Sequence, residues 1–303
     1  TMRRISRREI HSRVRLSTDH FNAFLSGLYF SHKPPLQKAK SVLEEMRSLS
    51  KKGHNTQPNL VTFNIILHCC AKSSDPTAPR VATELLHRLV LESKSDSSLL
   101  PDIKSYTAVC DAWARSKSLE GPVMAEEVLK TMNKFLPPDQ QNSAPYNAVM
   151  AAYARASKPV MVQQVFDSCK ALLQDRVDFR AYISLLQAWS KAGKPERASA
   201  VLHEILTKHD AGEFDARLTT QTFNAVLRAW LRSDRKEAAS QIEHGLQEMS
   251  NLSARYGCQP DSLSYMILLS QYTKDRRTDS GLRALEILAL LNSEFERTKS
   301  AIP

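Results

Sequence analysis

The chain has 303 residues, of which 42% are apolar and 24% are charged, an ordinary composition for a folded protein. Its 8 Gly and 14 Pro exclude collagen-like and glycine-rich chains, and no apolar run approaches the roughly 18 residues of a membrane-spanning helix. We therefore predict a soluble protein. Its five cysteines lack regular spacing, which argues against a secreted disulfide framework and for a reducing compartment.

The net charge of +10 is concentrated near the N-terminus. Residues 1–58 carry a net charge of +8, whereas the remaining 245 residues carry only +2. The overall charge therefore says little about the partner of the main body. The segment 1–17 is rich in Arg and poor in acids, which is typical of an organelle targeting segment, a basic arm or the solvated end of a helix.

A short pattern recurs along nearly the whole chain. Seven segments align without gaps on an aromatic residue followed by a position that we call the anchor, as in TFNIILHCCAK, SYTAVCDAWAR and PYNAVMAAYAR. The repeats predicted from this alignment cover 18–59, 60–102, 103–142, 143–178, 179–219, 220–261 and 262–297, followed by a tail at 298–303. The anchors are Asn22, Asn64, Thr107, Asn147, Ile183, Asn224 and Met266, spaced 36 to 43 residues apart.

The columns of this alignment predict a helix in each repeat, which we call helix A. The residue before the anchor is always aromatic, and apolar residues follow two, three and six positions after the anchor, as in Val149, Met150 and Tyr153. This spacing is the buried stripe of an amphipathic helix, so we assign the aromatic residues to the core and not to base stacking. We expect the N-caps of these helices to be Thr62, Ser105, Thr222 and Ser264.

A second helical pattern, helix B, follows each helix A, as in KAKSVLEEMRSL and ERASAVLHEIL. Pro and small polar residues separate the helices, and no segment has a strand pattern. Because one helical hairpin is too small to bury its own apolar face, neighbouring hairpins must stack into a continuous core. The sequence therefore predicts an all-α protein, an α-solenoid of about seven helix-turn-helix repeats.

The anchor and the positions four and eight residues later share one face of helix A, roughly opposite the buried stripe, and we call it the anchor face. Six of the seven repeats have a cation eight residues after the anchor, whereas the first repeat has Phe30. Such a cation stabilises the end of its own helix by about 0.3–1 kcal/mol, and a stacked row of cations can also follow a phosphate backbone. His68 falls on the same face. The six cations are Lys72, Arg115, Arg155, Lys191, Arg232 and Lys274.

The repeats resemble pentatricopeptide repeats, the helical-hairpin modules of organelle RNA-binding proteins. The resemblance covers residues 18 to about 297 and rests on the TFN and SYT openings, the WAR, YAR and WSKAGK ends of helix A, and the QPN, LLPD and CQPD segments before new repeats. The repeat lengths resemble those of the long-repeat P-type members, whereas the apolar anchors Ile183 and Met266 depart from the family pattern. The resemblance implies a right-handed superhelix, single-stranded RNA as the partner, and a location in the mitochondrion or plastid.

In that family, the anchor and the residue that closes the same repeat are thought to read one RNA base together. Asn, Thr and Asp suit this task because their short side chains can hydrogen-bond the edges of a base. The family's rules imply the site 5′-Y-U-A-U-N-U-N-3′, with N opposite the apolar anchors. We expect Asn147→Thr to change the preferred base with little effect on stability, because the anchor lies off the buried stripe. The implied pairs are Asn22 with Asn59, Asn64 with Asp102, Thr107 with Asn142, Asn147 with Asp178, and Asn224 with Asp261.

Motifs for catalysis and metal binding are missing from the sequence, including HExxH, GxxxxGK[ST], GxSxG, paired CxxC elements and the zinc deaminase signature. We therefore predict no enzymatic activity, no metal and no cofactor. Three functions remain: sequence-selective RNA binding in organelle RNA processing, stability or translation; a protein-binding scaffold; or the RNA-recognition part of a complex with catalysis elsewhere. The nearly neutral body is compatible with a scaffold, whereas the Asn/Asp pairs and the cation column favour RNA.

Overall fold

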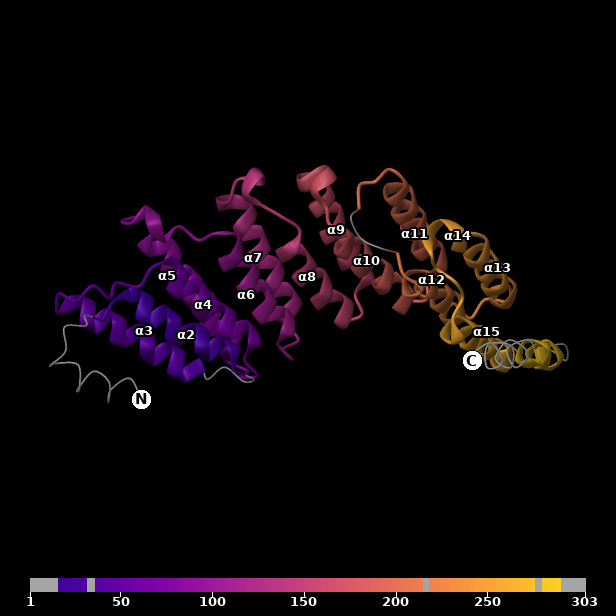
Figure 1. Cartoon of the computed structure of the whole chain (residues 1–303), viewed down its shortest axis with the longest axis horizontal. Helices are drawn as coiled ribbons and strands as arrows, with labels where there is room; N and C mark the ends of the chain where they lie inside the picture. The colour runs from indigo at the N-terminus through magenta and orange to yellow at the C-terminus, as the bar shows by residue number, and fades with distance from the viewer. Residues whose placement is uncertain (1–15, 32–35, 215–217, 276–279, 290–303) are drawn as a thin grey trace, which may run out of the picture. The chain divides into compact units, whose positions relative to one another are not determined.

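The computed structural model describes residues 16–31, 36–214, 218–275 and 280–289. Within these ranges every regular element is a helix and there is no strand, which confirms the prediction of an all-α protein (Figure 1). Most of the predicted basic segment 1–17 and the whole of the predicted tail 298–303 lie outside the described residues. None of the helices in the described ranges is both long and apolar enough to cross a membrane.

The chain divides into two compact units, residues 1–152 and 153–303, and helix α8 (Ala144–Arg155) crosses their border. In the first unit the helices A are α2 (Thr18–Phe30), α4 (Leu60–Lys72) and α6 (Ile103–Arg115), and the helices B are α3 (Leu36–Lys51), α5 (Ala78–Glu92) and α7 (Gly121–Phe135). In the second unit the helices A are α10 (Phe179–Lys191), α12 (Thr220–Arg232) and α15 (Ser262–Lys274), and the helices B are α9 (Pro159–Leu173), α11 (Pro195–Asp210) and α13 (Ala238–Asn251). The short helices are η1 (Ser97–Leu99), η2 (Pro138–Gln140), η3 (Gln174–Arg176) and α14 (Ser253–Tyr256), and residues 280–289 are also helical.

Each unit is built by stacking hairpins in chain order. In the first unit, α4 packs against the neighbouring helices A, α2 and α6, and against the helices B, α3 and α5. In the second unit, α12 packs in the same way against α10 and α15 and against α11 and α13. A helix A in such a position has neighbours in both adjacent repeats, so its apolar stripe is buried mainly by other hairpins. This is the packing of an α-solenoid and confirms the predicted fold.

The aromatic column before the anchor forms the centre of each core. Six of its seven members are buried, and the seventh, Tyr265, is half-buried against the cluster formed by α12, α13 and α15. The prediction that these rings belong to the core is therefore confirmed. The six buried residues are Phe21, Phe63, Tyr106, Tyr146, Tyr182 and Phe223.

Two tryptophans that stand six residues after their anchors tie neighbouring repeats together through hydrogen bonds. The indole Nε1 of Trp113 donates to Thr83 Oγ1 at 2.8 Å. The indole Nε1 of Trp189 donates to Gln163 Oε1 at 2.9 Å. In both cases the acceptor lies on helix B of the preceding repeat. A buried indole N–H needs such an acceptor, so these bonds hold the register of adjacent repeats as well as the core.

Glycine in the WSKAGK ending allows two helix ends to approach closely. Gly193 follows α10 with φ of 62°, and a Cβ at this position would lie 2.7 Å from the carbonyl oxygen of Arg232 at the end of α12. Any larger residue would force the two helix ends apart and would also strain the backbone. This motif is therefore a packing feature of the junction between α10 and α12.

All five cysteines are buried as thiols. Burial raises the pKa of Cys69 to about 11 and, together with the neighbouring Cys69, raises the pKa of Cys70 to about 12. Both thiols therefore stay protonated at neutral pH and behave as small apolar core residues.

Candidate functional site

Five of the six residues that close a repeat in front of another helix A are the N-cap of that helix, whereas Asn142 lies two residues before the start of α8. Asp102, for example, accepts a hydrogen bond from the backbone N–H of Ser105 at 2.8 Å, and the Ser105 hydroxyl lies 3.3 Å from the backbone N–H of Asp102 in a reciprocal capping box. The prediction that Thr62, Ser105, Thr222 and Ser264 are the N-caps is therefore wrong. The helices begin earlier, because Asn and Asp cap a helix at least as well as Ser and better than Thr. The N-caps of α4, α6, α10, α12 and α15 are Asn59, Asp102, Asp178, Thr219 and Asp261.

An anchor reaches across the junction between repeats to this cap. The Nδ2 of Asn64 donates to the two carboxylate oxygens of Asp102 at 3.2 and 3.3 Å. Its Oδ1 accepts a hydrogen bond from the Ser105 hydroxyl at 2.6 Å. Both ends of the amide are therefore tied to the start of the next helix A. We call this group of an anchor, an N-cap and a hydroxyl the junction clamp.

The junction clamp recurs in two further repeats. At the α2–α4 junction, Asn22 donates to Asn59 Oδ1 at 3.3 Å and accepts from the Thr62 hydroxyl at 2.7 Å. At the α12–α15 junction, Asn224 donates to Asp261 Oδ1 at 3.1 Å and accepts from the Ser264 hydroxyl at 2.7 Å. Three of the five pairs implied by the sequence are therefore in direct contact. The residues of this third clamp are Asn224, Asp261 and Ser264.

The structure does not join Thr107 to Asn142. The Thr107 hydroxyl donates to the carbonyl of Ile103 in its own helix at 2.7 Å, and Asn142 Oδ1 accepts from the backbone N–H of Ala144 at 3.0 Å. Asn147 and its implied partner belong to different units: Asn147 is in α8, and Asp178 caps α10 by accepting from the backbone N–H of Ala181 at 3.0 Å.

The anchors are more buried than the sequence predicts. Asn22 and Asn147 are 9% exposed and Asn224 has no exposed surface, whereas Asn64 and Thr107 are half-buried. The prediction of an open anchor face is wrong for the three buried anchors. In the clamps of Asn22 and Asn224 the physical reason is that the next helix A covers the anchor. Substitution of an anchor is therefore expected to change stability as well as any contact with a ligand.

We expect Asn64→Ala to lower the free energy of unfolding by about 1–3 kcal/mol, because it leaves the Ser105 hydroxyl and the Asp102 carboxylate without their partner across the junction. Denaturation in urea measures this change. Thr107→Ala is the matched control, since Thr107 is half-buried in the same column but bonds only within its own helix. Its effect should stay within about 0.5 kcal/mol. Equal losses in the two variants would contradict a role of the clamp in joining repeats.

Hydrogen bonds around Asp261 keep its carboxyl group ionised. Partial burial alone would raise its pKa, but hydrogen bonds from the side chain and backbone N–H of Ser264 and from Asn224 outweigh this effect, and the net pKa lies below the usual value. The third clamp therefore contains a carboxylate at neutral pH.

The cations eight residues after the anchor reach back by one repeat. Each of three cations donates to the carbonyl that lies seven residues after the preceding anchor, at 3.0 to 3.2 Å. They therefore cap the preceding helix A, whereas the sequence predicts a role at the end of their own helix. The bonds run from Lys72 to Tyr29, from Arg232 to Ser190 and from Lys274 to Leu231.

The six cations of this column are all exposed. The side chains of Arg115 and Lys191 make no hydrogen bond or ion pair with another residue in the described ranges. They are therefore the members of the column whose charge is most directly available to a ligand.

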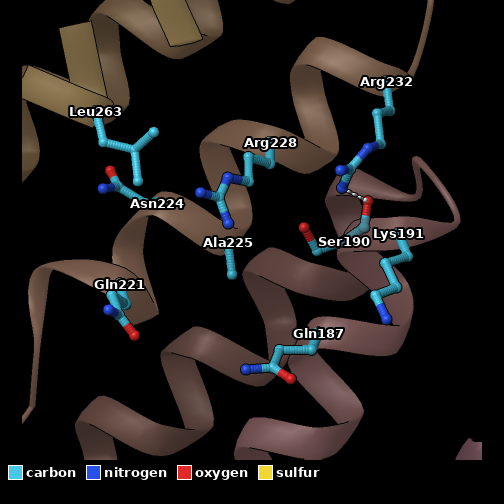
Figure 2. A pocket seen from close by; sticks show the side chains of 9 residues that line it. All are labelled: Gln187, Ser190, Lys191, Gln221, Asn224, Ala225, Arg228, Arg232 and Leu263. Carbon is cyan, nitrogen blue, oxygen red and sulfur yellow. Dashed lines mark hydrogen bonds between the residues drawn. The ribbon is translucent and has the colours of Figure 1, made fainter. Parts of the chain in front are cut away.

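A cationic pocket of about 360 Å³ opens between α10, α12 and α15 in the second unit. Its lining includes the predicted site residues Lys191, Asn224 and Arg232 and also Arg228, with no acidic side chain, so it attracts anions. Figure 2 shows these side chains, with Arg232 hydrogen-bonded to the carbonyl of Ser190. The remaining lining residues are Gln187, Ser190, Gln221, Ala225 and Leu263.

Sequence reasoning did not single out Arg228 and Gln187. Both lie four residues after their anchors, on the anchor face, but this column varies from repeat to repeat and so leaves no pattern. Their position on the anchor face of helix A was the only feature of the sequence that could have marked them as site residues. Among the described residues, no group of three or more His, Cys, Asp or Glu side chains is placed to hold a metal ion.

Known proteins with similar sequences contain pentatricopeptide repeats. The family model for the PPR repeat matches residues 144–171 and 180–209. A pentatricopeptide repeat-containing protein of Arabidopsis thaliana is 23% identical over 222 residues, covering 69% of this chain and 36% of the relative. A small ribosomal subunit protein of the same plant is 22% identical over 183 residues, covering 60% and 40%. A chloroplastic pentatricopeptide repeat-containing protein of this plant is 23% identical over 170 residues, covering 56% and 20%.

Solved structures show the same fold. The pentatricopeptide repeat protein PPR10 from maize matches 98% of this chain with a TM-score of 0.56 and 17% identity, over 42% of its own length. PPR10 in complex with an 18-nt psaJ RNA element matches 96% of this chain with a TM-score of 0.63 and 14% identity, over 37% of its length. The chain thus spans about two fifths or less of the length of these relatives.

Proposed function

Because the chain is a pentatricopeptide-repeat protein, we propose that it binds single-stranded RNA sequence-selectively along the anchor faces of its helices A. The observation that carries this proposal is the pocket between α10, α12 and α15, whose lining contains the three cations Lys191, Arg228 and Arg232 and no acidic side chain. Its polar, cationic lining also favours RNA over the apolar peptide groove expected of a protein-binding scaffold. The complex of PPR10 with an RNA element supports the same class of ligand.

The chemistry of the clamp leaves room for base reading. An Asn side chain has two N–H donors and two acceptor lone pairs, and the clamp of Asn64 engages one N–H group and one lone pair. One donor and one acceptor therefore remain on a half-buried amide. Uracil presents a carbonyl acceptor beside an N–H donor, which complements this remaining pair. We propose that Asp102 holds the Asn64 amide in the orientation that reads the base.

The cations supply contacts that do not depend on sequence. A Lys ammonium has three N–H donors, so Lys72 keeps two donors after capping the preceding helix. Phosphate contacts position a nucleic acid, while contacts to base edges select the sequence. We propose that the six cations hold phosphates and that the five implied pairs of anchor and closing residue, including Thr107 with Asn142, read bases.

We further propose that the protein acts in an organelle, in RNA processing, stability or translation, without a catalytic step of its own. Two relatives support this setting: one is described as chloroplastic, and another is a small ribosomal subunit protein. The second of these also supports an alternative in which the chain serves as the RNA-recognition part of a larger assembly.

Selection of bound RNA from a random single-stranded pool tests the proposed function. We expect enrichment of a short motif related to 5′-Y-U-A-U-N-U-N-3′, and tighter binding of the selected RNA than of its duplex form, because paired bases hide the edges that the anchors would read. Recovery of the starting pool without enrichment would contradict sequence-selective binding and would favour the protein-binding scaffold.

A further inference from the structure

The first repeat departs from the cation column. Phe30 stands eight residues after the anchor Asn22, where the other six repeats have Lys or Arg, and its side chain is 77% exposed at the end of α2. Single exposed apolar side chains are common on protein surfaces and need no special explanation. Phe30, however, lies on the anchor face and contacts the ring of Tyr29.

Three rings and one cation gather at the junction of α2 and α4. The ring of Tyr29 meets Phe30 edge-on with centroids 5.3 Å apart and lies 6.0 Å from the His68 ring. The Nζ of Lys72 lies 4.4 Å from the centroid of Tyr29. We call Tyr29, Phe30, His68 and Lys72 the aromatic corner. His68 belongs to the anchor face of the next repeat, so the corner extends along that face.

The aromatic corner has the chemistry of a base-stacking surface. Burial is the largest influence on His68 and lowers its pKa, with a smaller contribution from Lys104, against the opposing attraction of Asp111 and Asp102. The ring is therefore mostly neutral at neutral pH, and Lys72 supplies the positive charge of the corner. Proteins that bind single strands combine exposed aromatic rings, on which bases stack, with nearby cations that meet the backbone.

The other aromatic columns of the repeats do not offer such a surface. The rings before the anchors and the Trp113 and Trp189 indoles are buried or half-buried in the core, where they pack between helices. Phe30 contributes little to the core because most of its surface is open to solvent. The need to fill the core therefore does not explain an aromatic residue at this position of the anchor face.

We propose that Phe30, braced by Tyr29, is a stacking site for one unpaired base of the bound RNA, in the place where the other repeats use a cation. The ligand is the face of a nucleobase, so the site accepts any base and adds affinity without adding sequence selectivity. This inference rests on the proposed function, because it requires RNA on the anchor face.

The test compares the full chain with Phe30→Leu and Phe30→Tyr in binding to the selected single-stranded RNA. Phe30→Leu keeps an apolar side chain but removes the ring, and we expect it to weaken binding roughly 5- to 150-fold, the worth of one base stacked on an aromatic ring. Phe30→Tyr should bind as the wild type does. Because no charge changes, the salt dependence of all three proteins should be the same. Their thermal unfolding should coincide, since Phe30 is exposed.

Oligonucleotides with a single abasic position locate the stacked base. Removal of one particular base should weaken binding by the wild type and have little further effect on Phe30→Leu, because the two changes delete the same contact. If Phe30→Leu binds the intact RNA as tightly as the wild type, the stacking site is overturned while the proposed function stands. A wild type that binds no single-stranded RNA would overturn both.

Discussion

Raising monovalent salt from 50 to 200 mM should weaken RNA binding by roughly several hundredfold. Each phosphate contact to a single strand contributes about −0.7 to the slope of log K against log salt, so six contacts predict a slope of about −4. The proposed function assigns these contacts to the six exposed cations Lys72, Arg115, Arg155, Lys191, Arg232 and Lys274. Fluorescence anisotropy at four or five salt concentrations gives the slope directly.

The double variant Arg115→Ala, Lys191→Ala tests whether the cation column causes this salt dependence of RNA binding. It should flatten the slope by about 1.4, because two phosphate contacts are lost. These two positions are chosen because their side chains do not cap another helix, whereas Lys72, Arg232 and Lys274 do. Their removal should therefore leave stability nearly unchanged.

A second double variant, Arg80→Ala with Lys134→Ala, is the matched control for charge. Both residues are exposed and lie on helices B, away from the anchor face. This control should keep the wild-type slope. If Arg115→Ala, Lys191→Ala has the wild-type slope too, these cations do not contact phosphate.

Replacing Asn64 by Thr should move the preference at the second base of the site from U towards G. The family rules behind the resemblance associate Asn with Asp with uracil and Thr with Asp with guanine, and a good base contact discriminates by about 1–3 kcal/mol, by analogy with groove readout. Asn64 is the best place for this test because its amide is half-buried and its contact with Asp102 lies within one unit. Binding to four oligonucleotides that differ only at this base measures the preference.

The ranking of the four oligonucleotides within one protein does not depend on the folded fraction. It is therefore unaffected by the lost stability that we expect when the clamp is broken. Ile183→Val is the matched control. Because the anchor of the fifth repeat is apolar in both the wild type and this variant, we expect both proteins to discriminate little at the fifth base. If the wild type and Asn64→Thr rank the four bases alike, Asn64 and Asp102 form a clamp and do not read a base.

The class of fold follows from the sequence alone. Aromatic and apolar residues recur at fixed offsets from each anchor, and this periodicity is a local property of a helix that needs no knowledge of its neighbours. The same local logic correctly assigned Phe63 and Tyr106 to the core. It also showed that hairpins of this size must stack, because none of them buries its own apolar face.

The roles of the polar columns between repeats follow from the way neighbouring helices A pack in space. The clamp joins Asn64 to a cap 38 residues away, and the cation Lys72 bonds a carbonyl 43 residues back, so both contacts depend on how neighbouring helices A are rotated and offset. For the same reason the structure buried Asn224 and brought Arg228 into a shared pocket with Lys191. A repeat period places such residues in columns, but the stacking geometry decides which columns meet.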